Sequence, residues 1–320
     1  MTFYPLTFAP ILKPCAWGGD KLRSRLGKPL PRASTAGESW ELSAVPGSIS
    51  VVNNGAWQGR SLHAILEPDP QAILGAEVYR RFGAEFPLLV KFIDARSDLS
   101  IQVHPNDALA RKRHNCLGKP ELWYVMESEE NARLIAGFKN NSNAAQYLEH
   151  LNNNTLRDIV QEFPAETGAV FFLDPGTIHS IGAGVLLAEI QQTSDITYRV
   201  YDWDRVDAQG QRRELHLEQA LEAMNYQVVE ARRAYTRNAN QPNCLTESPY
   251  FTCNYLPLDG TLPVAHSGAS FRIYVCVAGH FSIDSGTARH EFKLGDTVLM
   301  PAALRDYTLS GQAILLEAYL

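Results

Sequence analysis

The final stretch of the chain, residues 245–320, contains short apolar runs separated by polar turns and shows no helical pattern. The runs at 271–277 and 297–300 are each too short for a helix and each ends near a turn residue. Similar runs fill much of 87–126 and 168–201. Many short strands with few helices are typical of β-barrels and jelly rolls. We therefore predict a mainly β fold.

Two segments repeat the order of glycine, apolar strand and proline turn. In the first, Gly168 is followed by Pro175 and then by His179. In the second, Gly295 is followed by Pro301, with no histidine at the matching place. The order resembles the second motif of the cupin family, Gly-x5-Pro-x-Gly-x2-His, although the first copy places its proline one residue late. The resemblance implies a bicupin, which has two jelly-roll barrels, with one metal-competent half and one degenerate half.

A polar linker near 232–242 predicts the boundary between two domains. The first, residues 1–235, would be the catalytic, metal-binding cupin with short helical segments. The second, residues 236–320, would be a degenerate cupin-like β domain. Capping residues and apolar periodicity predict a few short helices, at 61–66, 71–82, 144–151, 155–163 and 216–226.

Charge and cysteine content restrict partners and location. The 320 residues carry a formal net charge of −6, which argues against nucleic acid or an anionic membrane as the main partner. No apolar run approaches the length of about 18 residues that a membrane span needs, and the first residues lack the features of a signal peptide. The five cysteines are scattered and form no CxxC pair. A cytoplasmic protein is expected, and any metal would be held by nitrogen and oxygen.

The run 99–107 supplies the first half of a metal site. Gln102 and His104 lie two residues apart, so in a strand their side chains share one face. Glu121 begins a later strand, and a Pro-Gly turn would bring His179 back to the barrel mouth. Two imidazoles, a carboxylate and an amide oxygen suit Zn²⁺ with one position left open. Because an amide is a poor zinc ligand, Gln102 could instead support a ligand from outside the coordination shell.

Four motifs in this order resemble the type I mannose-6-phosphate isomerases, in particular their short bacterial form. The motifs are Gln-Val-His-Pro-Asn-Asp (102–107), Gly-Lys-Pro-Glu-Leu-Trp-Tyr (118–124), Pro-Gly-Thr-Ile-His-Ser (175–180) and Ser-Asp-Ile-Thr-Tyr-Arg (194–199). The resemblance implies one zinc ion per chain and the interconversion of mannose 6-phosphate, a small phosphorylated sugar, with fructose 6-phosphate. It places the zinc ligands at Gln102, His104, Glu121 and His179, and an active-site arginine at Arg199. The family's usual His-Lys-Pro-Glu begins with Gly118 here, so His114 is the nearest histidine that could replace the missing one.

Aldose–ketose isomerisation moves a proton between C2 and C1 through an enediol. It needs a base, stabilisation of the enediolate and a grip on the phosphate. Glu189 is a candidate base, and Arg199 could stabilise enediolate or phosphate charge. Asp195 could instead be the base, or could orient Arg199. Lys119 is a candidate for proton shuttling or phosphate contact, and a solvated loop lysine is an equal alternative.

Two other functions compete with the isomerase. A non-catalytic, sugar-binding cupin would have little need for Arg199, Lys119 and Glu121 beside a metal. An Fe²⁺-dependent cupin oxygenase would favour three ligands and two open positions, and a fourth ligand at Gln102 argues against it. The sequence contains neither a glycine-rich phosphate loop before a helix nor a Gly-x-Ser-x-Gly elbow, so P-loop, dinucleotide and serine hydrolase chemistry are not indicated.

Overall fold

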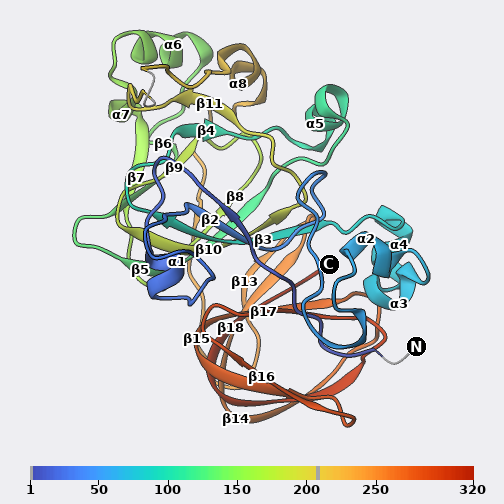
Figure 1. Cartoon of the computed structure of the whole chain (residues 1–320). Helices are drawn as coiled ribbons and strands as arrows, with labels where there is room; N and C mark the ends of the chain where they lie inside the picture. Colours follow the sequence, from blue (N-terminus) through green and yellow to red (C-terminus); the bar gives the residue numbers. More distant parts are fainter. Residues whose placement is uncertain (1–2, 207–209) are drawn as a thin grey trace.

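The computed structural model describes residues 3–206 and 210–320 (Figure 1). The part before residue 235 builds two antiparallel sheets. The larger sheet runs, in spatial order, β1 (Ile11–Lys13), β2 (Glu38–Leu42), β3 (Leu88–Ala95), β10 (Val185–Gln192), β5 (Glu121–Ser128), β8 (Val170–Leu173) and β12 (Arg232–Arg233). The smaller sheet runs β11 (Tyr198–Tyr201), β4 (Ile101–Val103), β9 (His179–Ile181), β6 (Arg133–Phe138) and β7 (Val160–Pro164).

The C-terminal part forms a separate antiparallel sheet at the opposite end of the molecule (Figure 1). Its strands are β13 (Asn243–Glu247), β14 (Thr252–Ala265), β15 (Arg272–Asp284), β16 (Arg289–Lys293), β17 (Thr297–Met300) and β18 (Asp306–Tyr319). An apolar cluster that includes Tyr274, Phe281 and Leu309 fills its interior. The prediction of a mainly β fold is confirmed.

The repeated segments occupy matching positions in the two halves. Gly168 precedes β8 and Gly295 precedes β17, with φ angles of 83° and 90° that favour glycine. His179 then begins β9, and Asp306 begins β18. The same turn therefore delivers an imidazole in the first half and a carboxylate in the second.

The helices are short and lie around the sheets (Figure 1). They are α1 (Lys21–Ser24), the 3₁₀ turn η1 (Gly55–Trp57), α2 (Leu62–Leu66), α3 (Pro70–Leu74), α4 (Ala76–Phe82), α5 (Asp107–His114), α6 (Ala144–Asn152), α7 (Leu156–Ile159) and α8 (Leu217–Ala223). Tyr147 of α6 and Ala220 of α8 pack with Ile101 and Val103 of β4. No helix in the described ranges is long and apolar enough to cross a membrane.

Two of the predicted helices differ from the structure. The predicted helix 71–82 is divided at Gly75, whose φ is 93° and whose added Cβ would lie 2.3 Å from the carbonyl oxygen of Ala269. The predicted helix 155–163 ends at Ile159, and the residues after it form β7, which pairs with β6. In both cases a contact distant in sequence overrides the local helical pattern.

The two halves share one hydrophobic core. A single cluster of buried residues extends from Leu6 to Ala318. Phe86 stacks on Phe271 across the junction, with ring centroids 4.8 Å apart. Leu6 exchanges two backbone hydrogen bonds with Leu299, at 2.9 and 2.8 Å. Full burial of each aromatic ring contributes roughly 1.5–3 kcal/mol, so the C-terminal sheet stabilises the part that carries the predicted site.

Strand β2 joins the junction to the interior of the first half. The side chains of Ser39 and Glu41 point to one face, where the Ser39 hydroxyl donates to Glu41. The Lys28 ammonium lies 2.6 Å from Oε2 of Glu41 and donates to the carbonyl oxygen of Gly295 at 2.7 Å. Glu38 and Trp40 of β2 point to the opposite face, because side chains alternate along a strand.

Candidate metal centre and catalytic pocket

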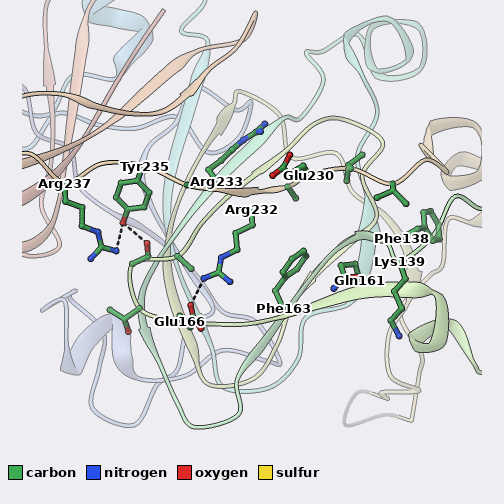
Figure 2. Close-up of a pocket in the computed structure, with 17 residues that line it drawn as sticks. Phe138, Lys139, Gln161, Phe163, Glu166, Glu230, Arg232, Arg233, Tyr235 and Arg237 are labelled. Atoms are coloured by element: carbon green, nitrogen blue, oxygen red, sulfur yellow. Dashed lines mark hydrogen bonds and ion pairs between the residues drawn. The ribbon is translucent and has the colours of Figure 1, made fainter.

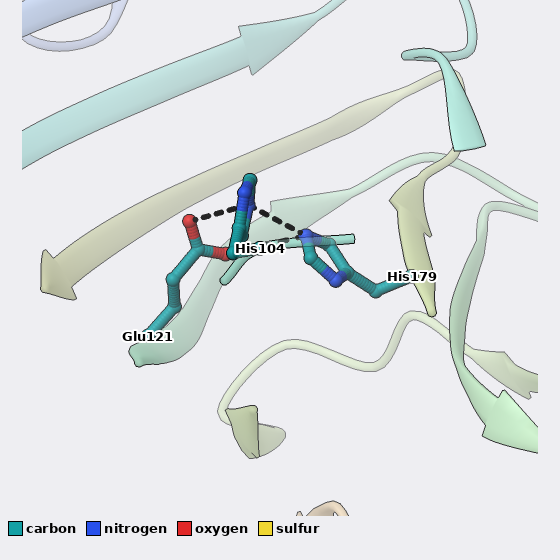
Figure 3. Close-up of side chains that lie close together, drawn as sticks. All are labelled: His104, Glu121 and His179. Atoms are coloured by element: carbon teal, nitrogen blue, oxygen red, sulfur yellow. Dashed lines mark hydrogen bonds and ion pairs between the residues drawn. The ribbon is translucent and has the colours of Figure 1, made fainter. Parts of the chain in front are cut away.

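Three of the predicted ligands meet at strand ends from both sheets, with β4 and β9 in the smaller sheet and β5 in the larger one. His104 follows β4, Glu121 begins β5 and His179 begins β9, and one ligand atom from each lies within 4.8 Å of the others (Figure 3). Nε2 of His104 is 3.1 Å from Nε2 of His179 and 3.2 Å from Oε1 of Glu121. All three side chains are about 1% exposed. The donors therefore converge in a site closed to bulk water.

Backbone carbonyls orient both imidazoles. Nδ1 of His104 lies 2.9 Å from the oxygen of Ile196, and Nδ1 of His179 lies 2.7 Å from the oxygen of Thr177. A carbonyl only accepts, so each Nδ1 carries the hydrogen and each neutral ring turns an Nε2 lone pair inward. Burial, followed by the Lys119 charge, lowers the pKa of His104 to about 3, and burial also lowers the pKa of His179. Two lone pairs that face each other at 3.1 Å favour a shared cation.

Glu121 supplies the negative charge of the cluster. Burial opposes its ionisation, but the nearby Lys119 ammonium holds the pKa of Glu121 well below its usual range. Lys119 Nζ lies 2.7 Å from Oε1 of Glu121 and 3.1 Å from Nε2 of His104. Neither oxygen of Glu121 forms a hydrogen bond of good geometry within the described part of the chain. Two neutral imidazoles and one carboxylate with spare lone pairs fit a divalent metal ion.

Gln102 lies beside this cluster. It is opposite His179 in the pairing of β4 with β9 and opposite Arg199 in the pairing of β4 with β11. Its side chain is partly exposed and lines the adjoining cavity. Its role as a fourth ligand stays a prediction.

A cavity of about 320 Å³ adjoins the three donors. Lys119 connects the two, because it lines the cavity and its ammonium contacts Glu121. This volume is in the range of small-ligand pockets. Five residues predicted from the sequence line it, namely Gln102, Lys119, Glu189, Asp195 and Arg199. Asp195 is exposed, whereas Glu189 is only 3% exposed. The sequence candidates thus share one pocket, with Glu189 inside it and Asp195 more open to solvent.

Two charged residues of this pocket, Glu38 and Lys91, received no role in the sequence analysis. Lys91 Nζ lies 3.1 Å from Oε1 of Glu189 and 3.5 Å from Oε2 of Glu38. The Trp40 indole donates to Glu38 at 2.6 Å, and the Trp123 indole donates to Glu189 at 2.8 Å. The sequence does contain a signal that could have pointed to Lys91, since it is the single lysine in the otherwise apolar run 87–93. Its partners come from β2 and β10, which flank β3.

The pKa values of the two carboxylates beside Lys91 are shifted in opposite directions. Burial and the charge of Glu121 raise the pKa of Glu189, although Lys91 opposes the shift. Burial likewise opposes ionisation of Glu38, but Lys91 and the Trp40 indole lower its pKa. Despite the cost of burial, Glu189 and Glu38 raise the pKa of Lys91. Glu189 is therefore the buried carboxylate of this pocket that accepts a proton most readily.

Guanidinium groups gather on another wall of the pocket. Arg199 donates from Nη1 to the carbonyl oxygen of Glu214 at 2.8 Å. Arg213 also lines the pocket, and its Nε donates to Oδ2 of Asp202 at 2.7 Å. Partial burial, followed by the charge of Arg213, lowers the pKa of Arg199. Two guanidinium groups on one wall of a small pocket form a natural site for an anion.

His114 does not reach the pocket. Its Nε2 lies 2.8 Å from the Tyr198 hydroxyl, and it is absent from the lining of the cavity. A Cβ at Gly118 would lie 2.6 Å from the backbone nitrogen of Asp107. The local backbone therefore leaves no room for a side chain at 118, which accounts for the glycine in that motif.

A larger cavity of about 750 Å³ lies elsewhere, beside β7 and β12 (Figure 2). It contains none of the residues predicted from the sequence. Arg232 pairs there with Glu166 at 2.5 Å, and Arg237 donates to the Tyr235 hydroxyl at 3.1 Å. Of the two cavities, the smaller one is lined by residues predicted from the sequence and is therefore the candidate site.

Two family models match the chain. "Phosphomannose isomerase type I, catalytic domain" covers residues 6–132, and "Mannose-6-phosphate isomerase, cupin domain" covers residues 243–320. The first match includes two of the three metal donors, His104 and Glu121. The second includes every strand of the C-terminal sheet, from β13 to β18.

Whole proteins match over their full length. Mannose-6-phosphate isomerase ManA of Bacillus subtilis is 33% identical over 324 residues, which cover 100% of both chains. Mannose-6-phosphate isomerase of Streptococcus mutans is 32% identical over 309 residues, covering 95% of this chain and 94% of that protein. A crystal structure of the Bacillus subtilis mannose 6-phosphate isomerase superposes with a TM-score of 0.90 at 31% identity, covering 99% of each chain. A putative mannosephosphate isomerase from Archaeoglobus fulgidus, 22% identical with a TM-score of 0.77, shares the fold.

Proposed function

This chain belongs to the type I mannose-6-phosphate isomerases, and from that premise we propose that it interconverts mannose 6-phosphate and fructose 6-phosphate through an enediol. The observation that carries the proposal is that three features lie side by side: a metal-donor cluster, which Lys119 contacts, and a small pocket lined by that same lysine, a buried carboxylate and a pair of guanidinium groups. The same proposal places the enzyme in the cytoplasm, whose reducing conditions suit its free cysteines.

We propose zinc as the resident ion, held by His104, Glu121 and His179 with Gln102 as the fourth ligand. Three such donors alone also suit Fe²⁺, and a fourth protein ligand at Gln102 would favour zinc by leaving a single open position in place of the two or more that Fe²⁺ oxygenases use. When bound, zinc would supply Lewis-acid stabilisation for the sugar oxygens that gain charge in the reaction.

Glu189 is the proposed base that removes the carbon-bound proton. It is buried in the pocket, its pKa is raised, and Lys91 and Trp123 hold its two oxygens. Raising the pKa of a carboxylate brings it closer to the working pH, which makes proton transfer in both directions more efficient. Asp195 is too exposed for that role and is proposed to orient Arg199.

Lys119 and the arginines serve the oxygens of the substrate. Lys119 lies between the donor cluster and the cavity, where its ammonium can give a proton to a sugar oxygen and take it back. Arg199 and Arg213 are proposed to bind the phosphate, because a planar guanidinium matches two phosphate oxygens. Asp202 holds Arg213 in place through its carboxylate.

A coupled assay on mannose 6-phosphate tests the proposal. The purified enzyme is assayed as isolated, after treatment with a chelator, and after return of either Zn²⁺ or Fe²⁺. We expect turnover to disappear with the chelator and to return with Zn²⁺. Absence of turnover in metal-replete enzyme would overturn the proposed reaction, and return with Fe²⁺ alone would overturn the proposed ion.

A further inference from the structure

Trp123 touches both parts of the proposed machinery. It is fully buried in β5, and its indole N–H donates to Oε2 of Glu189 at 2.8 Å. Its ring meets the imidazole of His179 edge to face, with centroids 5.4 Å apart. One rigid side chain thus contacts a metal-donor residue and the proposed base.

Strand pairing fixes this arrangement. Glu121 and Trp123 lie two residues apart in β5, so their side chains share one face. Trp123 is directly opposite Glu189 in the register of β5 with β10, and Glu121 is opposite Gln191. The spacing between metal donor and base is therefore set by one pair of strands, and Trp123 fills the space between them.

The hydrogen bond also leaves the second oxygen of the base in a defined place. With Oε2 of Glu189 bound to the indole, Oε1 lies 3.1 Å from the Lys91 ammonium, which also lines the pocket. A carboxylate without the indole donor could rotate about its side-chain bonds, and a proton acceptor displaced by about 1 Å loses on the order of a hundredfold in rate.

We propose that Trp123 is a positioning residue for the isomerisation: its indole N–H holds the Glu189 carboxylate, and its ring holds His179, at one fixed separation. This inference rests on the proposed function and adds a residue that touches neither substrate nor metal. Trp123 acts through Glu189, so its contribution should appear in kcat while substrate binding and metal content stay unchanged.

The test removes the N–H and keeps the aromatic ring. Trp123→Phe should retain its zinc, keep KM within about threefold of the parent and lose about 10- to 100-fold in kcat, because a buried hydrogen bond to a charged group is lost. Incorporation of 3-benzothienylalanine at position 123 replaces the N–H by sulfur at nearly constant shape. It should lower kcat in the same way, and it tests the inference even where phenylalanine leaves a destabilising cavity.

A matched control and a double variant separate positioning from general stability. Trp57→Phe makes the same change at a buried tryptophan that packs on Phe3 and Tyr4, away from the pocket, and should leave the activity of folded enzyme unchanged. In a Glu189→Gln background, Trp123→Phe should cost almost nothing further, because residues that act as one unit are not additive.

These results separate the positioning role of Trp123 from the proposed isomerase function. Losses that multiply in the double variant, loss of zinc from Trp123→Phe, or full kcat in the benzothienyl protein would overturn the positioning role and leave the proposed function standing. Absence of turnover in the unmodified enzyme would overturn the proposed function, and this inference with it.

Discussion

Replacing Lys91 by methionine removes the cation between two carboxylates. Lys91 is 4% exposed and Glu189 is 3% exposed, so neither group can recover its hydration. The distances of 3.1 Å to Glu189 and 3.5 Å to Glu38 are those of direct ion pairs. Breaking a buried pair by removing one partner costs about 3–5 kcal/mol, whereas an exposed pair is worth about 1 kcal/mol or less. We expect Lys91→Met to lose an amount in the larger range at neutral pH.

This loss should depend on pH in a defined direction. Without the ammonium, burial and the charge of Glu121 raise the pKa of Glu189 further in the folded protein, while the unfolded value stays near about 4.3. A group whose folded pKa is raised contributes stability that is present below its unfolded pKa and lost as pH rises through its folded pKa. The variant should therefore be closest to the parent near about pH 5 and furthest from it near about pH 8.

Urea unfolding followed by tryptophan fluorescence at both pH values measures the effect. Lys91→Met/Glu189→Gln removes both charges and should recover much of the lost stability. Lys112→Met, at a side chain that is 75% exposed, is the control and should change stability by less than about 0.5 kcal/mol at either pH. A loss for Lys91→Met below about 1 kcal/mol, or one equal at the two pH values, would refute the reasoning.

Three further predictions concern the site. His179→Ala should lose the metal, whereas Arg199→Ala should keep it and lose most turnover; equal metal loss, measured by elemental analysis beside the coupled assay, would show that Arg199 is wrongly assigned. The acid side of the pH profile of kcat/KM should have its midpoint above the ordinary glutamate pKa of 4.5, because burial and the Glu121 charge raise the pKa of Glu189. A midpoint at or below that pKa would contradict the choice of Glu189 as the base. Gly118→Ala should lower stability by about 1–3 kcal/mol through overpacking, and an unchanged Tm would mean that the backbone there can move apart.

The cluster of His104, Glu121 and His179 could be anticipated because each residue belongs to a local motif. His104 and Glu121 stand at a strand end and a strand start, and a proline–glycine turn precedes His179, while the order of the family motifs indicated that the three belong together. The family resemblance inferred from four such motifs is confirmed by the full-length matches. The mainly β fold followed from the same short-strand pattern.

Contacts between segments that are distant in the sequence could not be predicted from local patterns. Glu38 and Lys91 became functional candidates only when β2, β3 and β10 were seen to be neighbours in one sheet. Gly75 ends a helix because a carbonyl from Ala269 approaches it, and the residues after Ile159 leave the helical pattern because β6 offers them a partner. Local propensity does not contain the identity of a partner strand.

Strand β2 forms a wall between two environments. Glu38 and Trp40 line the catalytic pocket, while Glu41 faces Lys28 and the carbonyl oxygen of Gly295. A substitution on either face alters one environment alone. The insertion or deletion of a single residue would exchange the faces, turning Glu41 into the candidate pocket and the Trp40 indole toward the C-terminal sheet. The length of this strand is therefore constrained from both of its faces at once.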